Sequence, residues 1–329
     1  MQADNGSDNR PRVHLVASGG GHLDLLRDVA DVFAGHARTW VTVSGRAAAA
    51  LRESGERVLE VPPFDRRNKG TANLRASVRL AARERPELVV TSGAGIAVAF
   101  TGVARAREAR VVFVETMARV RDSSVSGRIL ARLAERTLVQ WEEMATVHPR
   151  AVTCRPALLE HVASEPTERG RGTFVALGTH HQPFDRLLAL VEQGARDGIL
   201  PAPVFAQAGA SSAAAPRGIE AVTTLPKQDL LERVRSSAVV VCQAGAGIAA
   251  AALRAGRRPL VLPRLARFGE HVDDHQEQLA GKLAALGLAI PVDERITDAD
   301  VAAAAAPIQV PGWPPEMPSL ASALSRAIG

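Results

Sequence analysis

The sequence is poor in aromatic residues. They make up 3% of its 329 residues, and tyrosine is absent. Because proteins that bind single-stranded nucleic acids stack the bases on aromatic side chains, this scarcity argues against that class, and we expect no nucleic-acid partner. The core must instead be filled by Ala, Val, Leu and Ile, as in parallel sheets that helices cover on both faces.

Cysteine is nearly absent as well. Cys154 and Cys242 are the only two, which excludes a disulfide-stabilised scaffold and a zinc site with the usual cysteine spacing. The longest apolar stretch, residues 88–104, is interrupted by Thr91, Ser92 and two glycines, so it predicts a strand, a turn and a buried helix rather than a membrane span. The polar N-terminal segment does not resemble a signal peptide, and we expect a cytoplasmic protein.

Lysine is the third scarcity. Lys69, Lys227 and Lys282 are the only lysines among 40 cationic residues, so arginine supplies nearly all of the positive charge in a chain of formal net charge +5. The planar guanidinium group binds phosphate oxygens in pairs, which suits nucleotide phosphates or anionic lipids. An arginine-rich composition with charges scattered over the surface explains the same balance, so charge alone assigns no ligand.

The sequence does contain a repeated alternation of β-branched runs with Ala- and Leu-rich helical segments, which is typical of βαβ units with parallel strands. A single hydrophobic core stops growing at roughly 250–300 residues, so the length predicts two domains. Strands are predicted at 13–17, 39–43, 57–61, 88–91, 111–114 and 137–139, and again at 173–177, 204–206, 238–242, 260–262 and 288–290. Helices are predicted at 23–33, 74–85, 184–193, 227–236, 248–255, 272–286, 298–305 and 319–328.

The predicted fold class is α/β, with two Rossmann-like domains whose parallel sheets face each other across a cleft. Prolines, Gly170 and charged residues interrupt the alternation between the two halves, as in a linker. Ligands of such sheets bind at the carboxyl ends of the strands. The predicted parts are a disordered N-terminus at 1–11, a first domain at 12–150, a linker at 151–171, a second domain at 172–312 and a C-terminal helical segment at 313–329 that could pack back on the first domain.

The first predicted strand leads into a glycine loop that ends in a histidine: Ser18, Gly19, Gly20, Gly21 and His22. Glycines let backbone N–H groups approach an anion closely, and the helix N-terminus that follows adds a favourable dipole. A histidine has an ordinary pKa near neutrality, so His22 is a candidate general base for deprotonating an acceptor hydroxyl. A tight turn with an ordinary helix histidine is the alternative.

Two further features at strand ends could line the same site. The loop at 91–95 follows a strand, and its Gly93 is a candidate contact for the acceptor, although close packing of helix on strand explains the same glycine. Glu115 also follows a strand and is a second candidate for acid–base chemistry, with Arg119 nearby as an acceptor contact. A solvated carboxylate is the alternative for Glu115.

Three loops at strand ends in the second half combine glycine with polar side chains. Backbone amides next to Gly178, and at a helix start next to Gly245 and Gly247, could bind a diphosphate. The polar segment 270–276 could supply carboxylates and amides for sugar hydroxyls. These loops predict a nucleotide-sugar site in the C-terminal half.

A metal site is not predicted. His271 and His275 are four residues apart and could share one face of a helix, as metal ligands do. The sequence holds no second cluster of ligands with that spacing. A helix N-terminus whose dipole is complemented by Glu270, Asp273 and Asp274 explains the acidic residues of this segment.

Several strings of the sequence resemble one group of transferases. In the second half, GTHHQPFDRLL, QAGAGIAAAALRAGRRPLVLPR and RFGEHVDDHQEQLA are similar to the donor domain of the lipid II-forming N-acetylglucosaminyltransferase. They are more similar to the smaller subunits of bacterial exopolysaccharide transferase pairs and of the eukaryotic dolichol-linked chitobiose-forming transferase. In the first half, SGGGHLDLL, VVTSGAGIAVAF and ETMARVRDSSVSGRILARLAERTLVQWEEM resemble the membrane-recruiting partner subunits. The chain looks like both subunits fused, partner first.

The resemblance implies a GT-B fold and an inverting, metal-independent transfer from a UDP-sugar, without a cofactor, to a polyprenyl diphosphate-linked sugar. It implies that the N-terminal glycine loop faces the acceptor phosphates, with His22 as the base. For the donor it implies that Gly178, Thr179, Gly245 and Gly247 contact the nucleotide diphosphate and that Glu270, Asp274, His275 and Gln276 line the sugar site. The further candidate donor residues are His180, Gln207, Gln243 and His271.

Three features depart from the pattern of the group. Gln243 stands where the group has a histidine, Ala251 stands where a helix glutamate binds the ribose, and the membrane anchor of the partner subunit has no counterpart. The acceptor could therefore be reached from a peripheral position on the inner face of the membrane, or be a soluble small molecule. Two other functions stay open: a UDP-sugar epimerase of the same architecture, and a degenerate protein that binds nucleotide-sugars without turnover.

Overall fold

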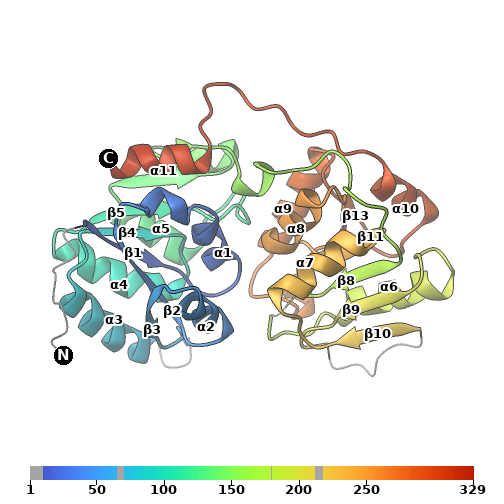
Figure 1. The fold of residues 1–329 in the computed structure, drawn as a ribbon, viewed down its shortest axis with the longest axis horizontal. Helices are drawn as coiled ribbons and strands as arrows, with labels where there is room; N and C mark the ends of the chain where they lie inside the picture. Colours follow the sequence, from blue (N-terminus) through green and yellow to red (C-terminus); the bar gives the residue numbers. More distant parts are fainter. Residues whose placement is uncertain (1–9, 65–69, 179, 212–217) are drawn as a thin grey trace. The chain divides into compact units, whose positions relative to one another are not determined.

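The computed structural model describes residues 10–64, 70–178, 180–211 and 218–329. It contains two compact units, each built on a parallel sheet with helices packed against it (Figure 1). The first unit extends through Thr116 and also includes Arg121–Ala157 and Pro315–Gly329; the second consists of Met117–Val120 and Leu158–Pro314.

The sheet of the first unit has seven parallel strands in the order β3-β2-β1-β4-β5-β6-β7. The order reverses between β1 and β4, so the loops that follow these two strands are neighbours at the carboxyl edge of the sheet. The six predicted strands are present, and a seventh, β7, lies in the stretch that we predict as a linker. The bounds are β1 Arg12–Val16, β2 Ala37–Val43, β3 Arg57–Val61, β4 Leu88–Thr91, β5 Arg110–Val114, β6 Arg136–Val139 and β7 Val152–Thr153.

Helices of the first unit cover this sheet. The predicted helix at 23–33 is divided, because the β-branched Val29 and Val32 and the intervening Asp31 favour a turn over continued α-helix. The elements are α1 Gly21–Asp28, η1 Ala30–Phe33, α2 Arg46–Glu53, α3 Thr71–Glu84, α4 Gly95–Ala106, α5 Val125–Leu133, η2 Glu142–Thr146 and, from the end of the chain, α11 Leu320–Ile328. The short η3 Ala157–Leu159 contains the point in the sequence where the first unit gives way to the second.

Helix α11 is part of the first unit although it follows the whole second unit in sequence. It packs against β6 and η1, and its buried side chains are Leu320, Ala323, Leu324 and Ala327. The Arg110 guanidinium donates hydrogen bonds to the carbonyls of Ala327 (3.1 Å) and Ile328 (2.8 Å). A cation at this end of a helix also complements its dipole.

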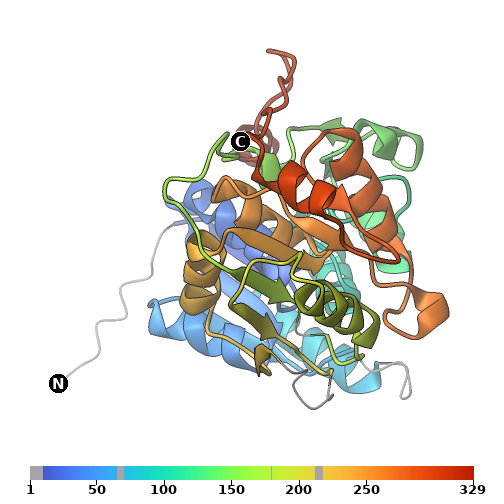
Figure 2. The ribbon, with the colours of Figure 1, turned by 90° about the vertical axis from the view of Figure 1, so that its right-hand side faces the viewer.

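The sheet of the second unit has six parallel strands in the order β10-β9-β8-β11-β12-β13, with helices around it (Figure 2). Its strands are β8 Thr173–Ala176, β9 Val204–Gln207, β10 Ile219–Val222, β11 Val239–Gln243, β12 Leu260–Leu262 and β13 Ile290–Pro291, of which β10 is not predicted by the sequence. Its helices are α6 Asp185–Arg196, α7 Lys227–Ser236, α8 Ala246–Arg254, η4 Ala266–Phe268, α9 His275–Ala285 and α10 Asp298–Ala305.

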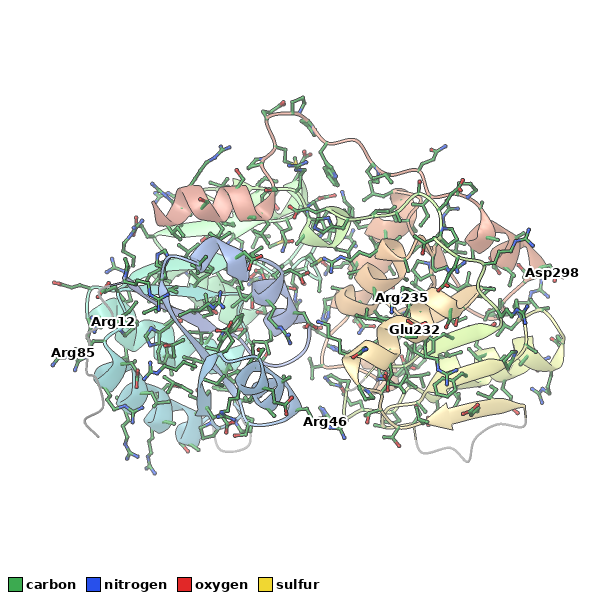
Figure 3. All side chains as sticks on the ribbon, in the orientation of Figure 1. Arg12, Arg46, Arg85, Glu232, Arg235 and Asp298 are labelled. Atoms are coloured by element: carbon green, nitrogen blue, oxygen red, sulfur yellow. The ribbon has the colours of Figure 1, made fainter. Side chains whose placement is uncertain are left out.

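Charged side chains are spread over both units, as Figure 3 shows. The labelled Arg12, Arg46, Arg85 and Arg235 are all exposed, in agreement with a scattered surface charge. Within the part of the chain that the structure describes, each helix is too short or too polar to cross a bilayer.

Candidate active site

In the first unit, the glycine loop after β1 opens directly into helix α1. Gly20 is the N-cap and has a φ of +77°, a conformation that glycine adopts without the strain of a side chain. His22 is the second residue of the helix. The first-turn amides of Gly21, His22 and Leu23 have no acceptor within the helix, so they can bind an anion.

The side chain of His22 connects this loop to the loop after β4. Its Nδ1 lies 2.8 Å from the carbonyl oxygen of Ser92, and the Ser92 hydroxyl donates to the carbonyl of His22 over 2.8 Å. Because a carbonyl can only accept, Nδ1 carries the proton and Nε2 is the unprotonated nitrogen of the neutral ring. Gly93 lies against the same ring, where an added Cβ would be 3.4 Å from Cε1 of His22.

Glu115, the second candidate base, is enclosed. It is 3% exposed, and its carboxylate accepts hydrogen bonds from the Ser123 hydroxyl (2.5 Å) and from the Thr116 amide (3.1 Å). His148 Nε2 lies 3.5 Å from the same carboxylate. These contacts hold Glu115 in a buried network with the segment that follows β5 and with His148, whereas the side chain of His22 is partly exposed.

In the second unit, one buried arginine holds the loops at the carboxyl edge of the sheet together. Arg264 follows β12 and is 0% exposed. Its guanidinium donates to the carbonyl of Leu177 after β8 (2.6 Å) and to Oε1 of Gln243 at the end of β11 (2.8 Å). It also donates to the carbonyls of Gln182 (2.8 Å) and Glu270 (3.0 Å). Burial lowers its pKa to about 10, opposed by the charge of Glu270, so it stays cationic at neutral pH.

Sequence reasoning misses Arg264, because an arginine after a strand carries no motif. It also misses Arg186 on α6, which forms a two-pronged ion pair with Glu270 at 2.9 and 3.1 Å. Glu270 is 5% exposed and accepts a further hydrogen bond from the Leu265 amide (3.0 Å). A carboxylate held this firmly fixes the shape of the loop, and it is less accessible to a sugar hydroxyl than the sequence suggests.

The predicted glycine loops surround Gln243. Gly178 has a φ of +82°, and an added Cβ would come within 2.1 Å of the Gln243 amide, so only glycine fits there. Gln276 is 4% exposed, and its side-chain amide lies 3.2 Å from Gln243 Oε1. Gly245 is the N-cap of α8 and Gly247 its second residue, so the first-turn amides of this helix point out of the end of the sheet.

Three buried polar atoms near this edge lack a hydrogen-bond partner among the described residues: His180 Nδ1, Gln182 Oε1 and Gln207 Oε1. His180 and Gln182 lie in the loop after β8, and Gln207 ends β9. An unsatisfied buried polar group costs about 1–3 kcal/mol, so a gathering of them indicates a site that a polar ligand completes. Thr179, predicted beside them, lies outside the described residues.

Histidines gather at the same edge. The ring of His180 lies 4.7 Å from that of His271 and 4.6 Å from that of His181, and His271 lies 4.6 Å from His275. Burial, together with the charges of the nearby histidines and of Arg264, lowers the pKa of His180 from 6.5 to about 4, so its ring is neutral at pH 7.

Asp273 lies among these rings. Its Oδ1 is 2.5 Å from His275 Nδ1 and 3.4 Å from His271 Nδ1, and its Oδ2 is paired with Arg119, which belongs to the second unit with its neighbours 117–120. Burial alone would raise the pKa of Asp273, but the hydrogen bonds from the two histidines and the charges of His275 and Arg119 bring it far below the ordinary value.

Helix α9 begins at His275 rather than at 272 as predicted. The preceding residues are held by side-chain contacts instead of helix hydrogen bonds: Asp274 Oδ1 accepts from the Ala266 amide (2.7 Å). His271 therefore lies before the helix rather than on its face. Ala251 on α8 stands where the related transferases have a glutamate that binds the ribose. It is 9% exposed and offers no polar group to a ribose.

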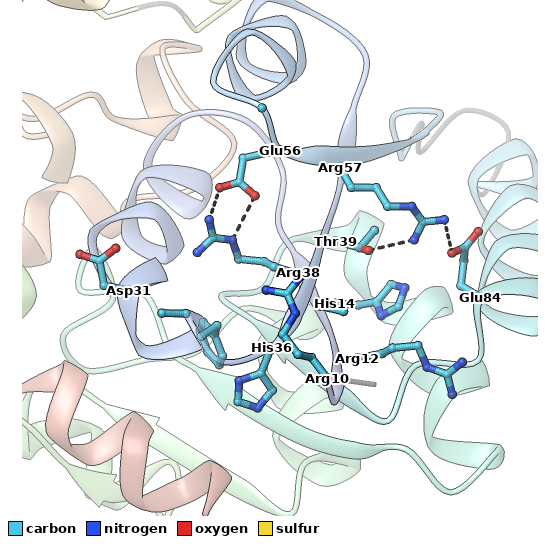
Figure 4. A pocket seen from close by; sticks show the side chains of 14 residues that line it. Arg10, Arg12, His14, Asp31, His36, Arg38, Thr39, Glu56, Arg57 and Glu84 are labelled. Carbon is cyan, nitrogen blue, oxygen red and sulfur yellow. Dashed lines mark hydrogen bonds and ion pairs between the residues drawn. The ribbon is translucent and has the colours of Figure 1, made fainter. Parts of the chain in front are cut away.

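A pocket of about 700 Å³ lies in the first unit around the opposite, amino ends of its strands (Figure 4). Arg38 is paired there with Glu56, and Arg57 with Glu84 at 2.7 Å. His14 lies beside them with 1% exposure and no hydrogen-bond partner on either ring nitrogen among the described residues. Burial lowers its pKa from 6.5 to about 4, only partly opposed by Glu84.

His14 should make the first unit sensitive to acid. The unfolded chain binds this proton below pH 6.5 and the folded chain only near pH 4, so stability is full above pH 6.5 and falls by about 3 kcal/mol towards pH 4. We expect His14→Leu to remove that part of the loss. Urea unfolding between pH 7.5 and 4.5, followed by the fluorescence of Trp40 and Trp141, measures it. If the free energy of unfolding of His14→Leu falls with decreasing pH as steeply as that of the wild type and of the exposed-site control His161→Leu, His14 does not have this role.

The two sheets and their glycine-rich edges define the class of protein: it has the GT-B architecture, as predicted. Similar solved structures are MurG of Acinetobacter baumannii (TM-score 0.58, 18% identity, 86% of each chain) and the glycosyltransferase of kitacinnamycin (0.62, 17%, 97% of this chain and 95% of that one). The UDP-GlcNAc 2-epimerase of Methanocaldococcus jannaschii also has a similar fold, with a TM-score of 0.65 and 10% identity over 96% of this chain and 98% of that one. At these identities the likeness shows the fold alone.

The sequence assigns the family. The profile described as "Oligosaccharide biosynthesis protein Alg14 like" matches residues 69–155, and that of the "Glycosyltransferase family 28 C-terminal domain" matches 206–297. The UDP-N-acetylglucosamine transferase subunit ALG14 of Eremothecium gossypii is 31% identical over 180 residues, 44% of this chain and 80% of that protein. The subunit alg14 of Schizosaccharomyces pombe is 34% identical over 71 residues, 20% of this chain.

The chain belongs to the Alg14 family and carries a family 28 glycosyltransferase domain on the same polypeptide. This confirms the predicted fusion of the two subunits, partner first. The chain spans little more than a third of the length of two of the relatives, 34% of the protein from Schizosaccharomyces pombe and 38% of that from Yarrowia lipolytica.

Proposed function

We propose that this protein is an inverting glycosyltransferase that moves a sugar from a UDP-sugar to a hydroxyl group of a polyprenyl diphosphate-linked sugar or a related glycolipid. The observation that carries the proposal is the carboxyl edge of the second sheet, where Arg264 fixes three loops around the N-terminus of α8. The Alg14-like and family 28 segments, and relatives named as UDP-N-acetylglucosamine transferase subunits, support it.

The second unit is the proposed donor domain. The first-turn amides of α8, next to Gly245 and Gly247, would bind the diphosphate and stabilise the charge that develops on it as the bond to the sugar breaks. Oε1 of Gln207 and Nδ1 of His180, which lack a partner among the described residues, would meet polar groups of the donor. Amides and arginine can hold the leaving diphosphate, so the transfer itself requires no metal cofactor in this proposal.

The first unit is the proposed acceptor domain, with His22 as the base. Its Nε2 would take the proton of the acceptor hydroxyl while that oxygen attacks C1 of the sugar from the face opposite the leaving UDP, which inverts the configuration at C1. The amides of the glycine loop and Gly93 would lie against the acceptor phosphates. In this proposal Glu115 takes no part in the proton transfer and holds the segment after β5 through Ser123 and Thr116.

Analysis of the reaction products tests the proposal against its alternatives. A transferase releases UDP and adds the mass of the sugar to the acceptor. An epimerase leaves the mass of the UDP-sugar unchanged and needs no acceptor. It is tested as an alternative because the UDP-GlcNAc 2-epimerase of Methanocaldococcus jannaschii has the same fold. If UDP binds but neither product forms with any acceptor, the protein is a degenerate one that binds nucleotide-sugars without turnover. Ala251 and Gln243, which depart from the pattern of the group, are the reason to test this alternative.

A basic and apolar surface of the first unit fits a membrane-bound acceptor. Leu74 and Val78 on α3 are 50% and 42% exposed, and Val125 and Ile129 on α5 are 77% and 37% exposed. Both helices pack against α4, and exposed arginines alternate with the apolar side chains: Arg75, Arg79, Arg128 and Arg132. This combination is typical of surfaces that lie in the interface of an anionic bilayer. We therefore propose a cytoplasmic protein that binds the inner face of the membrane peripherally.

The double variant Val125→Ser/Ile129→Ser should weaken binding to vesicles that contain anionic lipid by roughly tenfold or more, because two apolar side chains no longer enter the interface. Flotation of vesicles with bound protein measures this. The matched control is Val152→Ser/Val310→Ser, which removes two valines that are 44% and 46% exposed elsewhere. Equal losses in both double variants, or none in either, would contradict the assignment of this surface.

A further inference from the structure

The histidines at the carboxyl edge of the second sheet form an unusual arrangement. His271, Asp273 and His275 each offer a ligand atom, and these atoms all lie within 4.8 Å of one another. Around a tetrahedral zinc ion, with bonds of about 2.0–2.2 Å, the ligand atoms are roughly 3.3–3.5 Å apart. The 3.4 Å between His271 Nδ1 and Asp273 Oδ1 matches that spacing, and the ring of His275, at 2.5 Å from the same oxygen, would have to move away from it.

The carboxylate of Asp273 is oriented for this role. Its Oδ1 faces both imidazole rings, at 2.5 Å from His275 and 3.4 Å from His271, while Oδ2 is held by Arg119. Partners that hold the outer atoms of a metal ligand fix its orientation. A cation could therefore bind at Oδ1 without displacing Arg119, and it would replace only the hydrogen bonds between Asp273 and the rings.

His180 supplies an independent observation. Its buried Nδ1 has no hydrogen-bond partner among the described residues, and its ring lies 4.7 Å from that of His271. A neutral imidazole with an unused lone pair is the form that binds transition metals. The loop after β8 thus places a further imidazole with a partnerless nitrogen beside the three ligands of segment 271–275.

We propose that His271, Asp273 and His275, with water as the fourth ligand, form a binding site for a divalent transition-metal ion such as Zn²⁺ or Co²⁺. Imidazole and carboxylate ligands of this number suit such ions better than Mg²⁺ or Ca²⁺. The binding of the metal does not depend on the proposed function. Its consequence does: since His180, His271 and His275 belong to the proposed donor site, the ion competes with the UDP-sugar and inhibits a transfer that needs no metal.

Titration of the full-length, chelator-treated protein with Co²⁺ tests the site without any activity assay. We expect one equivalent to bind with the strong visible absorption of four-coordinate cobalt, and added Zn²⁺ to remove that absorption. His271→Ala, Asp273→Asn and His275→Ala should each weaken binding at least tenfold. The matched control is His161→Ala, an exposed histidine of the same unit.

Circular dichroism and melting of each metal-free variant show whether it is folded, and UDP binding in the presence of chelator is measured separately. Absence of stoichiometric Co²⁺ binding, or binding that is unchanged in the three variants, overturns the metal site while leaving UDP binding intact. If the wild-type protein binds Co²⁺ but does not bind UDP, the proposed function is contradicted and the metal site is supported. Metal that binds but is not displaced by UDP-sugar refutes the competition.

Discussion

Replacing His22 with alanine is expected to lower kcat by roughly 10²–10⁴, the usual loss on removal of a general base. The melting temperature should change little, because the ring is only partly buried and its hydrogen bond to the Ser92 carbonyl joins two loops that the adjacent β1 and β4 already hold. Affinity for the donor should be unchanged, since the proposed donor residues belong to the second unit. Steady-state release of UDP measures the effect.

His22→Asn should be no better than His22→Ala, because an amide can hydrogen-bond but cannot accept the proton. An acid limb of the wild-type pH–rate profile that comes from protonation of this ring should be missing from the residual activity of His22→Ala. Retention of more than about a tenth of the wild-type kcat would reject His22 as the base. Glu115, enclosed by Ser123 and His148, would then take over the assignment.

The second large effect concerns Gly247 on α8. In Gly247→Val a branched side chain would stand over the helix N-terminus and prevent a diphosphate from reaching the amides. Two charge-assisted hydrogen bonds, at about 1.5–3 kcal/mol each, correspond to a loss of donor affinity of roughly 10²–10⁴-fold. Calorimetric titration with UDP measures this directly.

Gly281→Val is the matched control, because Gly281 is an exposed glycine within α9 with open space around the position of a Cβ. It carries the same helix-propensity cost as Gly247→Val but lies outside the proposed site. If both variants bind UDP like the wild type, the N-terminus of α8 is not part of the donor site. If both lose it equally, the loss comes from folding.

The sequence predicts the two parallel sheets well, because buried parallel strands such as β4 and β11 are continuous β-branched runs and their loops are marked by glycine. It misses β7 and β10, short strands at the edges of the sheets, since two to four residues beside prolines or polar turns carry too little periodicity. The start of α9 is misplaced because Asp273 and Asp274, which look like helix-capping residues, instead hold the loop through side-chain contacts.

The candidate site is only partly accessible to sequence reasoning. The pairing of His22 with the Ser92 loop follows from the strand order, which places the ends of β1 and β4 side by side. The role of Arg264 does not, because its partners are mostly backbone carbonyls from loops distant in sequence, and carbonyls leave no trace in side-chain patterns. The same holds for the pair of Arg186 with Glu270, which comes from the packing of α6 against the segment before α9.

The return of α11 to the first unit has a consequence for the order in which the protein folds. The ribosome delivers residues 1–157 first, yet the helix that covers β6 and η1 arrives only after about 160 further residues, which takes roughly 10–30 s at ordinary rates of synthesis. During that interval the apolar surface that later meets Leu320 and Leu324 is uncovered. The first unit is therefore the first to emerge and the last to be completed, and a chaperone that shields this surface would act on the nascent chain until the final helix docks.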